Sequence, residues 1–424
     1  MREHKAHITR AWVLHPDITS DRTRRAAELA LAEAVALAAA LPGLEVVGTN
    51  VVRLPKPQPG KLFGSGKIDE LETLFKAQDI ELVLIDGPVT PVQQRNLEKA
   101  WGVKLLDRTG LILEIFSDRA ATREGVLQVE MAALSYQRTR LVRAWTHLER
   151  QRGGLGFVGG PGETQIEADR RAIDDQLIRL RRQLDKVVKT RGLHRAARAK
   201  VPYPIVALVG YTNAGKSTLF NRLTGAEVMA KDMLFATLDP TMRAVKLPDG
   251  PDVILSDTVG FISDLPTELV AAFRATLEEV LAADLILHVR DISHEGTEDQ
   301  AQDVRDILNS LGVSDTTRML EVWNKLDAMS EVDRVATVAR AEREDGVFAT
   351  SALTGEGLDL LLEAVNRCLE GERREEMLHL GFEDGRKRAW LFDKALVEEE
   401  QQDETGYQLR VRWSAKDARQ FETL

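Results

Sequence analysis

The feature that most constrains the fold is a glycine-rich octapeptide that follows an apolar run. Gly210-Tyr-Thr-Asn-Ala-Gly-Lys-Ser217 fits the pattern GxxxxGK[S/T], and residues 205–209 directly before it are all apolar. Such a run suits a strand that is buried on both faces of a parallel sheet. In that context the backbone N–H groups of the loop surround phosphate oxygens, and the N-terminus of the next helix adds its dipole. The octapeptide therefore predicts a site for a nucleoside phosphate.

Buried-strand patterns and helical stretches alternate from residue 202 to residue 370. The strand candidates after the octapeptide are residues 253–256, 285–289, 319–323 and 347–349. Alternation of this kind indicates an α/β domain with a doubly wound, mostly parallel sheet. Ligands of such sheets bind at the carboxyl ends of the strands.

Three further elements each follow a predicted strand. The carboxylate of Asp257 in Asp257-Thr-Val-Gly260 can hold Mg²⁺ through water, and the N–H of Gly260 can meet a γ-phosphate. Asp327 of Asn324-Lys-Leu-Asp327 can accept from the N1–H and 2-amino groups of guanine, which adenine lacks. Ser351-Ala-Leu353 can present a backbone N–H to guanine O6. Together the elements predict binding of GTP and GDP with Mg²⁺.

Residues 1–118 form a second α/β pattern. Helices are expected from about residue 21 to Pro42, at 70–77 and at 91–101, and strands at 44–54, 81–85, 103–106 and 111–116. This rhythm predicts a small, mostly parallel sheet that ends near residue 118.

Residues 119–200 change to apolar steps of four and three, interrupted by glycines between 153 and 162. The pattern predicts an antiparallel helical hairpin with a glycine-rich tip. From Arg138 to Lys200 there are 16 Lys and Arg against 7 Asp and Glu, whereas the whole chain carries a net charge of -10. Either these cations only solvate the outer helix faces, or the hairpin faces RNA; the local excess favours RNA.

Residues 371–424 predict a small C-terminal α/β domain, with a helix at 386–397, an acidic turn at 398–404 and a strand at 407–413. A single cysteine, Cys368, excludes an internal disulfide and a cysteine-based zinc site. The longest apolar run, Leu29 to Leu41, has 13 residues and is broken by Glu33, which is too short for a membrane span. We expect a soluble, cytoplasmic monomer.

Several segments outside the octapeptide resemble the HflX family of GTPases: 64–67 (GSGK), 107–109 (DRT), 119–130 (RAATREGVLQVE) and 154–171 (GLGFVGGPGETQIEADRR). The resemblance covers residues from about 60 to 355. It implies a GTPase that binds the large (50S) ribosomal subunit and its rRNA through the N-terminal domain and the hairpin. It also implies a role in ribosome splitting, rescue or biogenesis.

The resemblance identifies 235–239 as switch I, with Thr237 as the second Mg²⁺ ligand beside Ser217. From the residues alone, Thr237 and Thr241 are equal candidates. The expected catalytic groups are Lys216, Thr237 and Gly260. The expected nucleotide-binding residues are Gly210, Tyr211, Thr212, Asn213, Ala214, Gly215, Lys216, Ser217, Phe235, Ala236, Thr237, Leu238, Asp239, Asp257, Thr258, Val259, Gly260, Asn324, Lys325, Leu326, Asp327, Ser351, Ala352 and Leu353.

Phe261 occupies the position at which Ras-like proteins carry a water-orienting glutamine. A phenyl ring cannot orient water, so slow intrinsic hydrolysis and stimulation by the ribosome are expected. Asn213 lies where an asparagine could recruit K⁺, or it serves only the tight loop. Two other functions remain open: a nucleotide-gated ribosome-assembly checkpoint with little turnover, and an RNA-stimulated NTPase that uses ATP.

Overall fold

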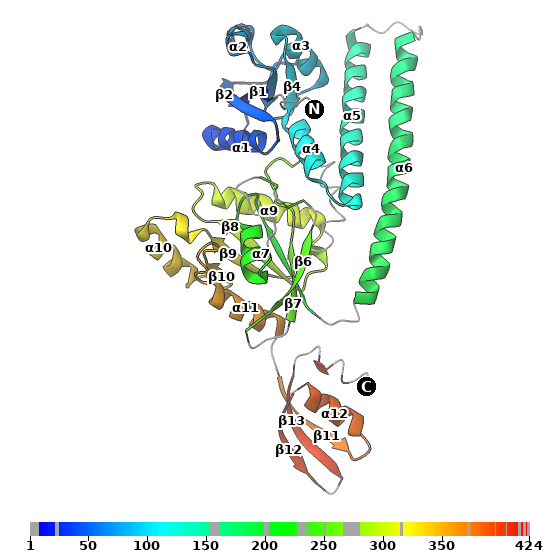
Figure 1. Ribbon diagram of the computed structural model, residues 1–424, viewed down its shortest axis with the longest axis vertical. Coiled ribbons are helices and arrows are strands. Elements are labelled where there is room, and N and C mark those ends of the chain that lie inside the picture. The colour runs from blue at the N-terminus through cyan, green and yellow to red at the C-terminus, as the bar shows by residue number, and fades with distance from the viewer. Residues whose placement is uncertain are drawn as a thin grey trace, which may run out of the picture.

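The computed structural model describes residues 8–21, 25–151, 161–198, 203–226, 234–235, 237–238, 240–248, 252–265, 280–313, 317–370, 374–394, 396–403, 405–413, 417–418 and 421. These residues form three sheets and a pair of long helices (Figure 1). Among them, no helix combines the length and the apolar character needed to cross a membrane.

The first sheet has four parallel strands in the order β2-β1-β3-β4. We call this sheet and its four helices the N-terminal unit. Its strands are β1 (Thr9–Ile18), β2 (Leu44–Leu54), β3 (Leu82–Ile85) and β4 (Lys104–Asp107). Its helices are α1 (Ala27–Ala39), α2 (Ser65–Ala77), α3 (Pro91–Trp101) and α4 (Arg108–Arg119). Apolar residues of α2 and α3 pack on one face of the sheet, and those of α1 and α4 pack on the other.

The prediction for residues 111–116 is wrong, because they lie in helix α4 and not in a strand. Their five apolar side chains are all buried, and a short run that is apolar apart from Glu114 does not distinguish a strand from a buried helix. The helix start is fixed by Asp107, whose Oδ1 accepts a hydrogen bond from the N–H of Gly110 at 2.8 Å. Strand β1 was not predicted at all.

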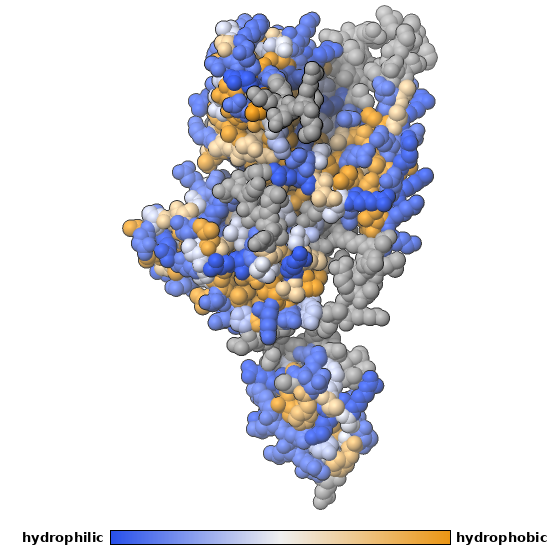
Figure 2. Space-filling model, viewed as in Figure 1, coloured by the Kyte–Doolittle hydropathy of each residue, from blue (hydrophilic) through white to orange (hydrophobic). Residues whose placement is uncertain are grey.

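The predicted hairpin consists of α5 (Arg123–Gln151) and α6 (Pro161–Arg198), which lie side by side (Figure 1). Arg138 pairs with Asp174 across the two helices at 3.0 Å. Asp107 also joins α5 to the end of β4, since it accepts hydrogen bonds from the hydroxyl of Tyr136 at 2.5 Å and from Arg140 at 2.9 Å. Residues 153–160 of the predicted glycine-rich tip lie outside the described part of the chain, whereas Pro161 and Gly162, also assigned to the tip, form the first turn of α6. Figure 2 shows hydrophilic side chains along the outer edge of α6.

The second sheet has six strands in the order β10-β9-β8-β5-β7-β6, and it confirms the predicted doubly wound, mostly parallel fold. Only β6 runs antiparallel to its neighbour. The strands are β5 (Ile205–Gly210), β6 (Thr241–Lys246), β7 (Asp252–Asp257), β8 (Leu285–Asp291), β9 (Arg318–Asn324) and β10 (Val347–Ala349). The described helices are α7 (Lys216–Thr224), α9 (Thr297–Leu311), α10 (Glu331–Ala341) and α11 (Leu358–Glu370), with the short 3₁₀ helix η1 (Leu326–Ala328).

The two faces of this sheet are covered differently. Apolar residues of α7 and α11 form the core on one face. On the other face, α9 contributes Val304 and Leu308 to a core that also contains Leu37 of α1 and Phe116 of α4. The N-terminal unit and the six-stranded sheet therefore share one apolar core.

The third sheet is antiparallel, in the order β11-β13-β12, and lies at the opposite end of the molecule from the N-terminal unit (Figure 1). It comprises β11 (Arg374–Gly381), α12 (Gly385–Asp393), β12 (Val397–Gln402) and β13 (Gly406–Trp413). Two predictions need correction here, since β11 was missed and most of the expected acidic turn is strand β12. Glu399 of β12 pairs with Arg410 of β13 at 3.4 Å and Glu398 with Arg412 at 3.7 Å, whereas Glu400 pairs with Arg388 of α12 at 2.8 Å. Charge pairs therefore support a strand with weak apolar patterning.

Candidate nucleotide-binding site

The glycine-rich octapeptide forms the loop between β5 and α7, as predicted. Gly215 has a φ of 93°, and a Cβ at this position would lie 2.2 Å from Nδ2 of Asn324. Asn213 also has a positive φ, of 60°, which asparagine tolerates better than most residues. The loop thus turns tightly enough for its backbone to surround a phosphate group.

Lys216 lies at the start of α7 with its side chain buried. Its Nζ donates to the carbonyl oxygens of Gly210 at 3.1 Å and Tyr211 at 2.7 Å. Burial lowers the pKa of Lys216 to about 8, although the nearby carboxylate of Asp257 opposes that shift. A buried ammonium group that is held only by two carbonyls is well placed to bind the β- and γ-phosphates.

The pKa of Lys216 predicts that GTP binding weakens in alkaline solution. The triphosphate favours the charged lysine, so binding above pH 8 requires the lysine to take up a proton. The affinity for GTP is expected to fall about tenfold between pH 7 and pH 9, because one proton is involved. Titration of a fluorescent GTP analogue at several pH values measures this. Lys216→Arg, which keeps its charge over that range, is expected to bind with a nearly flat pH profile; the same slope in both proteins would contradict the assignment.

Three oxygen-bearing side chains converge beside Lys216. Oδ2 of Asp257 accepts hydrogen bonds from Ser217 at 2.7 Å and Thr237 at 2.8 Å, and the two hydroxyl oxygens lie 2.9 Å apart. Asp257 is fully buried, and its Oδ1 has no hydrogen-bond partner in the described part of the chain. Burial raises the pKa of Asp257, opposed by Lys216 and the two hydroxyls. Hard oxygen ligands around a buried carboxylate fit Mg²⁺, with Ser217 and Thr237 as ligands and Asp257 acting through water.

Gly260 lies against the phosphate loop. A Cβ on Gly260 would be 2.9 Å from Cγ2 of Thr212 and 3.1 Å from Nζ of Lys216, so only glycine fits. The next residue is tied to the same loop: the N–H of Phe261 donates to Gly210 at 3.1 Å, and its carbonyl accepts from the N–H of Thr212 at 2.7 Å. This pairing holds Gly260 beside the lysine that is expected to bind the γ-phosphate.

The phenyl ring of Phe261 is 1% exposed and belongs to the core shared with the N-terminal unit. It therefore neither faces a water molecule in the site nor has an atom that could orient one.

The predicted base-recognition elements meet at the ends of β9 and β10. Asn324 donates to the carbonyl of Ala214 at 2.9 Å and accepts from the N–H of Ala352 at 2.9 Å, so it joins the phosphate loop to the 351–353 segment. The hydroxyl of Ser351 donates to Oδ1 of Asp327, whose side chain is exposed. Leu353 is 68% exposed. The arrangement presents a positioned carboxylate next to backbone N–H groups, which matches the edge of guanine.

The remaining predicted residues have mainly structural side chains. Thr258 donates to the carbonyl of Leu208 at 2.7 Å, and Val259, Leu326 and Leu238 are buried. The ring of Phe235 packs edge-on against Phe116 of α4, with centroids 4.6 Å apart. Ala236 and Asp239 lie outside the described residues.

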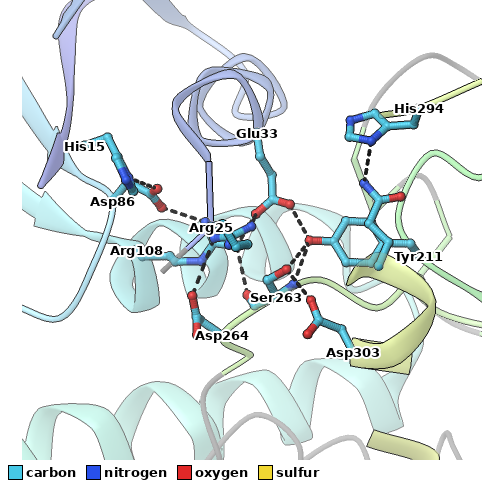
Figure 3. Close-up of polar contacts among 11 residues, drawn as sticks. His15, Arg25, Glu33, Asp86, Arg108, Tyr211, Ser263, Asp264, His294 and Asp303 are labelled. Carbon is cyan, nitrogen blue, oxygen red and sulfur yellow. Dashed lines mark hydrogen bonds and ion pairs between the residues drawn. The ribbon is translucent and has the colours of Figure 1, made fainter. Parts of the chain in front are cut away.

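Sequence reasoning missed four residues that contact the site. One of them is Asp291 at the end of β8, which pairs with the predicted residue Lys325 at 2.7 Å. The other three are Glu33, Arg108 and Ser263 (Figure 3). Glu33 and Ser263 contact the hydroxyl of Tyr211, and Arg108 donates to Glu33 and to the carbonyl of Ser263. The sequence carried two signals: Glu33 interrupts the apolar run from Leu29 to Leu41, and Arg108 lies in the 107–109 segment that resembles the HflX family.

Comparison with known proteins gives four adjoining family matches. In chain order these are a GTP-binding GTPase N-terminal region (28–117), a GTP-binding GTPase middle region (119–198), a 50S ribosome-binding GTPase (205–325) and an HflX C-terminal domain (336–423). The GTPase HflX of Magnetococcus marinus is 50% identical over 389 residues, which cover 91% of this chain and 87% of that protein. The GTPase HflX of Escherichia coli is 42% identical over 380 residues, which cover 89% and 88%.

Among solved structures, a GTP-binding protein of Sulfolobus solfataricus in complex with GDP is 22% identical, over 85% of this chain and 98% of that one, with a TM-score of 0.44. The six-stranded sheet, the phosphate loop and the base-reading elements define a P-loop GTPase, an enzyme that hydrolyses GTP to GDP and phosphate. The sequence identity of 42–50% to these two relatives, over most of their length, shows the family: the chain belongs to the HflX GTPases.

Proposed function

We propose that this GTPase binds the large ribosomal subunit and its rRNA through the N-terminal unit and the hairpin of α5 and α6. The match of residues 205–325 to 50S ribosome-binding GTPases carries the proposal. The basic excess between Arg138 and Lys200 supports it, because a cationic surface on an acidic protein suits a polyanion. Arg179, Arg181 and Arg182 of α6 are exposed. The role that follows is cytoplasmic, in ribosome splitting, rescue or biogenesis, with the chain acting as a monomer.

GTP serves as substrate with Mg²⁺ held by Ser217 and Thr237, and Lys216, Thr237 and Gly260 stabilise the transferred phosphoryl group. When bound, the metal would supply positive charge that offsets the negative charge of the phosphates. The chain's own residues close the site: Asp257 orients both hydroxyls, and Asn324 holds the phosphate loop against the base-reading segment. The carboxylate of Asp327 favours guanine over adenine, which argues against an ATP-driven RNA remodeller.

Binding to the large subunit is expected to depend on salt and on the arginines of α6. Co-sedimentation of the full chain with purified subunits, in GDP or a non-hydrolysable GTP analogue, is expected to show large-subunit binding with the analogue. Affinity should fall steeply as salt rises, and reversing Arg179, Arg181 and Arg182 to glutamate should lower the salt slope by about one per lost phosphate contact.

The matched control reverses three exposed arginines outside the hairpin, Arg343, Arg367 and Arg386. Equal effects of the two triple reversals, or binding that ignores salt, would mean that the arginines of α6 only solvate the helix.

A monovalent cation at Asn213 is proposed to assist hydrolysis. Asn213 lies inside the phosphate loop with a positive φ, and the buried phenyl ring of Phe261 cannot orient water. A K⁺ ion near Asn213 could neutralise charge that develops between the β- and γ-phosphates. Turnover in potassium is expected to exceed turnover in sodium by about tenfold, and Asn213→Ala is expected to abolish that difference. Equal rates in both salts would leave Asn213 with a loop-forming role alone.

A further inference from the structure

The N-terminal unit contacts the phosphate side of the GTPase site through a buried polar cluster, made of Glu33, Arg108, Tyr211 and Ser263 (Figure 3). Glu33 comes from α1 and Arg108 from the start of α4, whereas Tyr211 belongs to the phosphate loop and Ser263 follows Phe261 by two residues. The cluster therefore connects two parts of the chain that lie more than 150 positions apart in sequence.

The Tyr211 hydroxyl both donates and accepts a hydrogen bond. Its oxygen accepts from the N–H of Ser263 at 2.8 Å, and its proton is donated to Oε2 of Glu33. The hydroxyl of Ser263 lies 2.6 Å away and donates to Asp303 of α9 at 2.5 Å. Burial raises the pKa of Tyr211, with the carboxylate of Glu33 adding to the shift, so the hydroxyl keeps its proton at neutral pH. The tyrosine thus joins the phosphate loop, α1 and the segment after Gly260 through a single oxygen atom.

Arg108 reinforces the same junction. Its guanidinium is 5% exposed and donates to Asp86 at 2.6 Å, to Oε1 of Glu33 at 2.5 Å and to the carbonyl of Ser263 at 2.8 Å. A buried cation is costly unless it is paired, and removing one partner leaves the others uncompensated. Glu33 is thereby held by Arg108 while it holds Tyr211.

Switch I is joined to the N-terminal unit by a separate contact. The edge-on packing of Phe235 against Phe116 lies two residues before Thr237, a proposed Mg²⁺ ligand. Phe235 has a positive φ of 55°, which phenylalanine rarely adopts, so the surrounding core holds it in place.

We propose that Glu33 and Arg108 are positioning residues for GTP hydrolysis, which act through Tyr211 and Ser263 to keep Gly260 against Lys216. Ser263 lies three residues after Gly260, and Phe261 between them is hydrogen-bonded to both sides of Tyr211. Loss of the Glu33–Tyr211 contact frees the segment after Gly260 to move away from the γ-phosphate. By the same linkage, a partner that moves the N-terminal unit changes the rate of hydrolysis.

The test measures GTP turnover by the full chain for Tyr211→Phe, Glu33→Gln and the double variant. Each single change is expected to lower kcat about tenfold while KM for GTP and Kd for GDP change less than about twofold, because a small displacement affects the transition state more than ground-state binding. The double variant is expected to lose no more kcat than the worse single variant, since both changes act on the same hydrogen bond between Tyr211 and Glu33. Glu70→Gln, which removes an exposed carboxylate paired with Lys67 on α2 at 2.7 Å, is expected to keep the parental kcat.

An unchanged kcat in Tyr211→Phe would overturn the proposal. A parallel loss of GTP and GDP affinity without loss of kcat would also overturn it, because the tyrosine would then only shape the loop. Additive losses of kcat in the double variant would contradict it as well. If Glu33→Gln does not fold, Glu33→Asp replaces it; this variant keeps the charge and shortens the reach by one methylene. It too is expected to lower kcat without changing Kd for GDP, and a parental kcat would count against the proposal.

Discussion

Lys216→Ala is expected to lower kcat/KM for GTP by about 1,000-fold or more. The ammonium group is buried at the start of α7, 3.1 Å or less from two loop carbonyls, and next to the buried carboxylate of Asp257. It is the one cation that the described loop brings to the expected position of the γ-phosphate, so its loss removes charge stabilisation in a site that excludes water. Steady-state GTP turnover measures the effect.

The fold should survive the Lys216→Ala change. The variant removes a buried cation whose pKa is depressed by burial, so the melting temperature is expected to stay within about 5 °C of that of the parent. Normal turnover in a folded variant would place the reacting phosphate elsewhere.

Asp327→Asn is expected to weaken GTP binding by about 100-fold and to move the preference toward xanthosine triphosphate. The change replaces a carboxylate that accepts from two guanine donors by an amide that directs its own N–H groups at them. Xanthine has an oxygen where guanine has its 2-amino group, so the amide finds an acceptor there. Competition binding with GTP, ATP and xanthosine triphosphate measures the change.

Asp345→Asn, at another exposed carboxylate of the same half of the chain, serves as the control and is expected to bind GTP as the parent does. If Asp327→Asn and the control bind GTP equally well, Asp327 does not read the base.

The nucleotide site could be predicted because its residues are local in sequence. Each element is a short string at the end of a strand, and the sheet topology alone brings those ends together. The contacts of the N-terminal unit could not be predicted in the same way. Glu33 and Tyr211 are 178 positions apart, and neither segment carries a pattern that predicts contact with the other.

Errors in the fold have equally local causes. Residues 111–116 have the pattern of a strand because five of the six are apolar. The helix they form is buried on most sides, so its sequence shows no helical periodicity. Strand β12 could not be predicted because its glutamates hide the alternation, and two of them pair with arginines of β13. Phe261, in contrast, was recognised from its position alone, and the structure adds that it lies in the shared core.

GTP turnover with and without purified ribosomal subunits tests the central claim most directly. The full chain alone is expected to hydrolyse GTP slowly, because Phe261 is buried in the core and cannot orient water. The large subunit is expected to raise kcat by about 100-fold or more, the scale on which partners activate GTPases that lack a complete catalytic set, and the small subunit is expected to have no effect. Turnover that is equally fast with and without the large subunit would contradict the account, and binding without any stimulation would favour a nucleotide-gated assembly checkpoint instead.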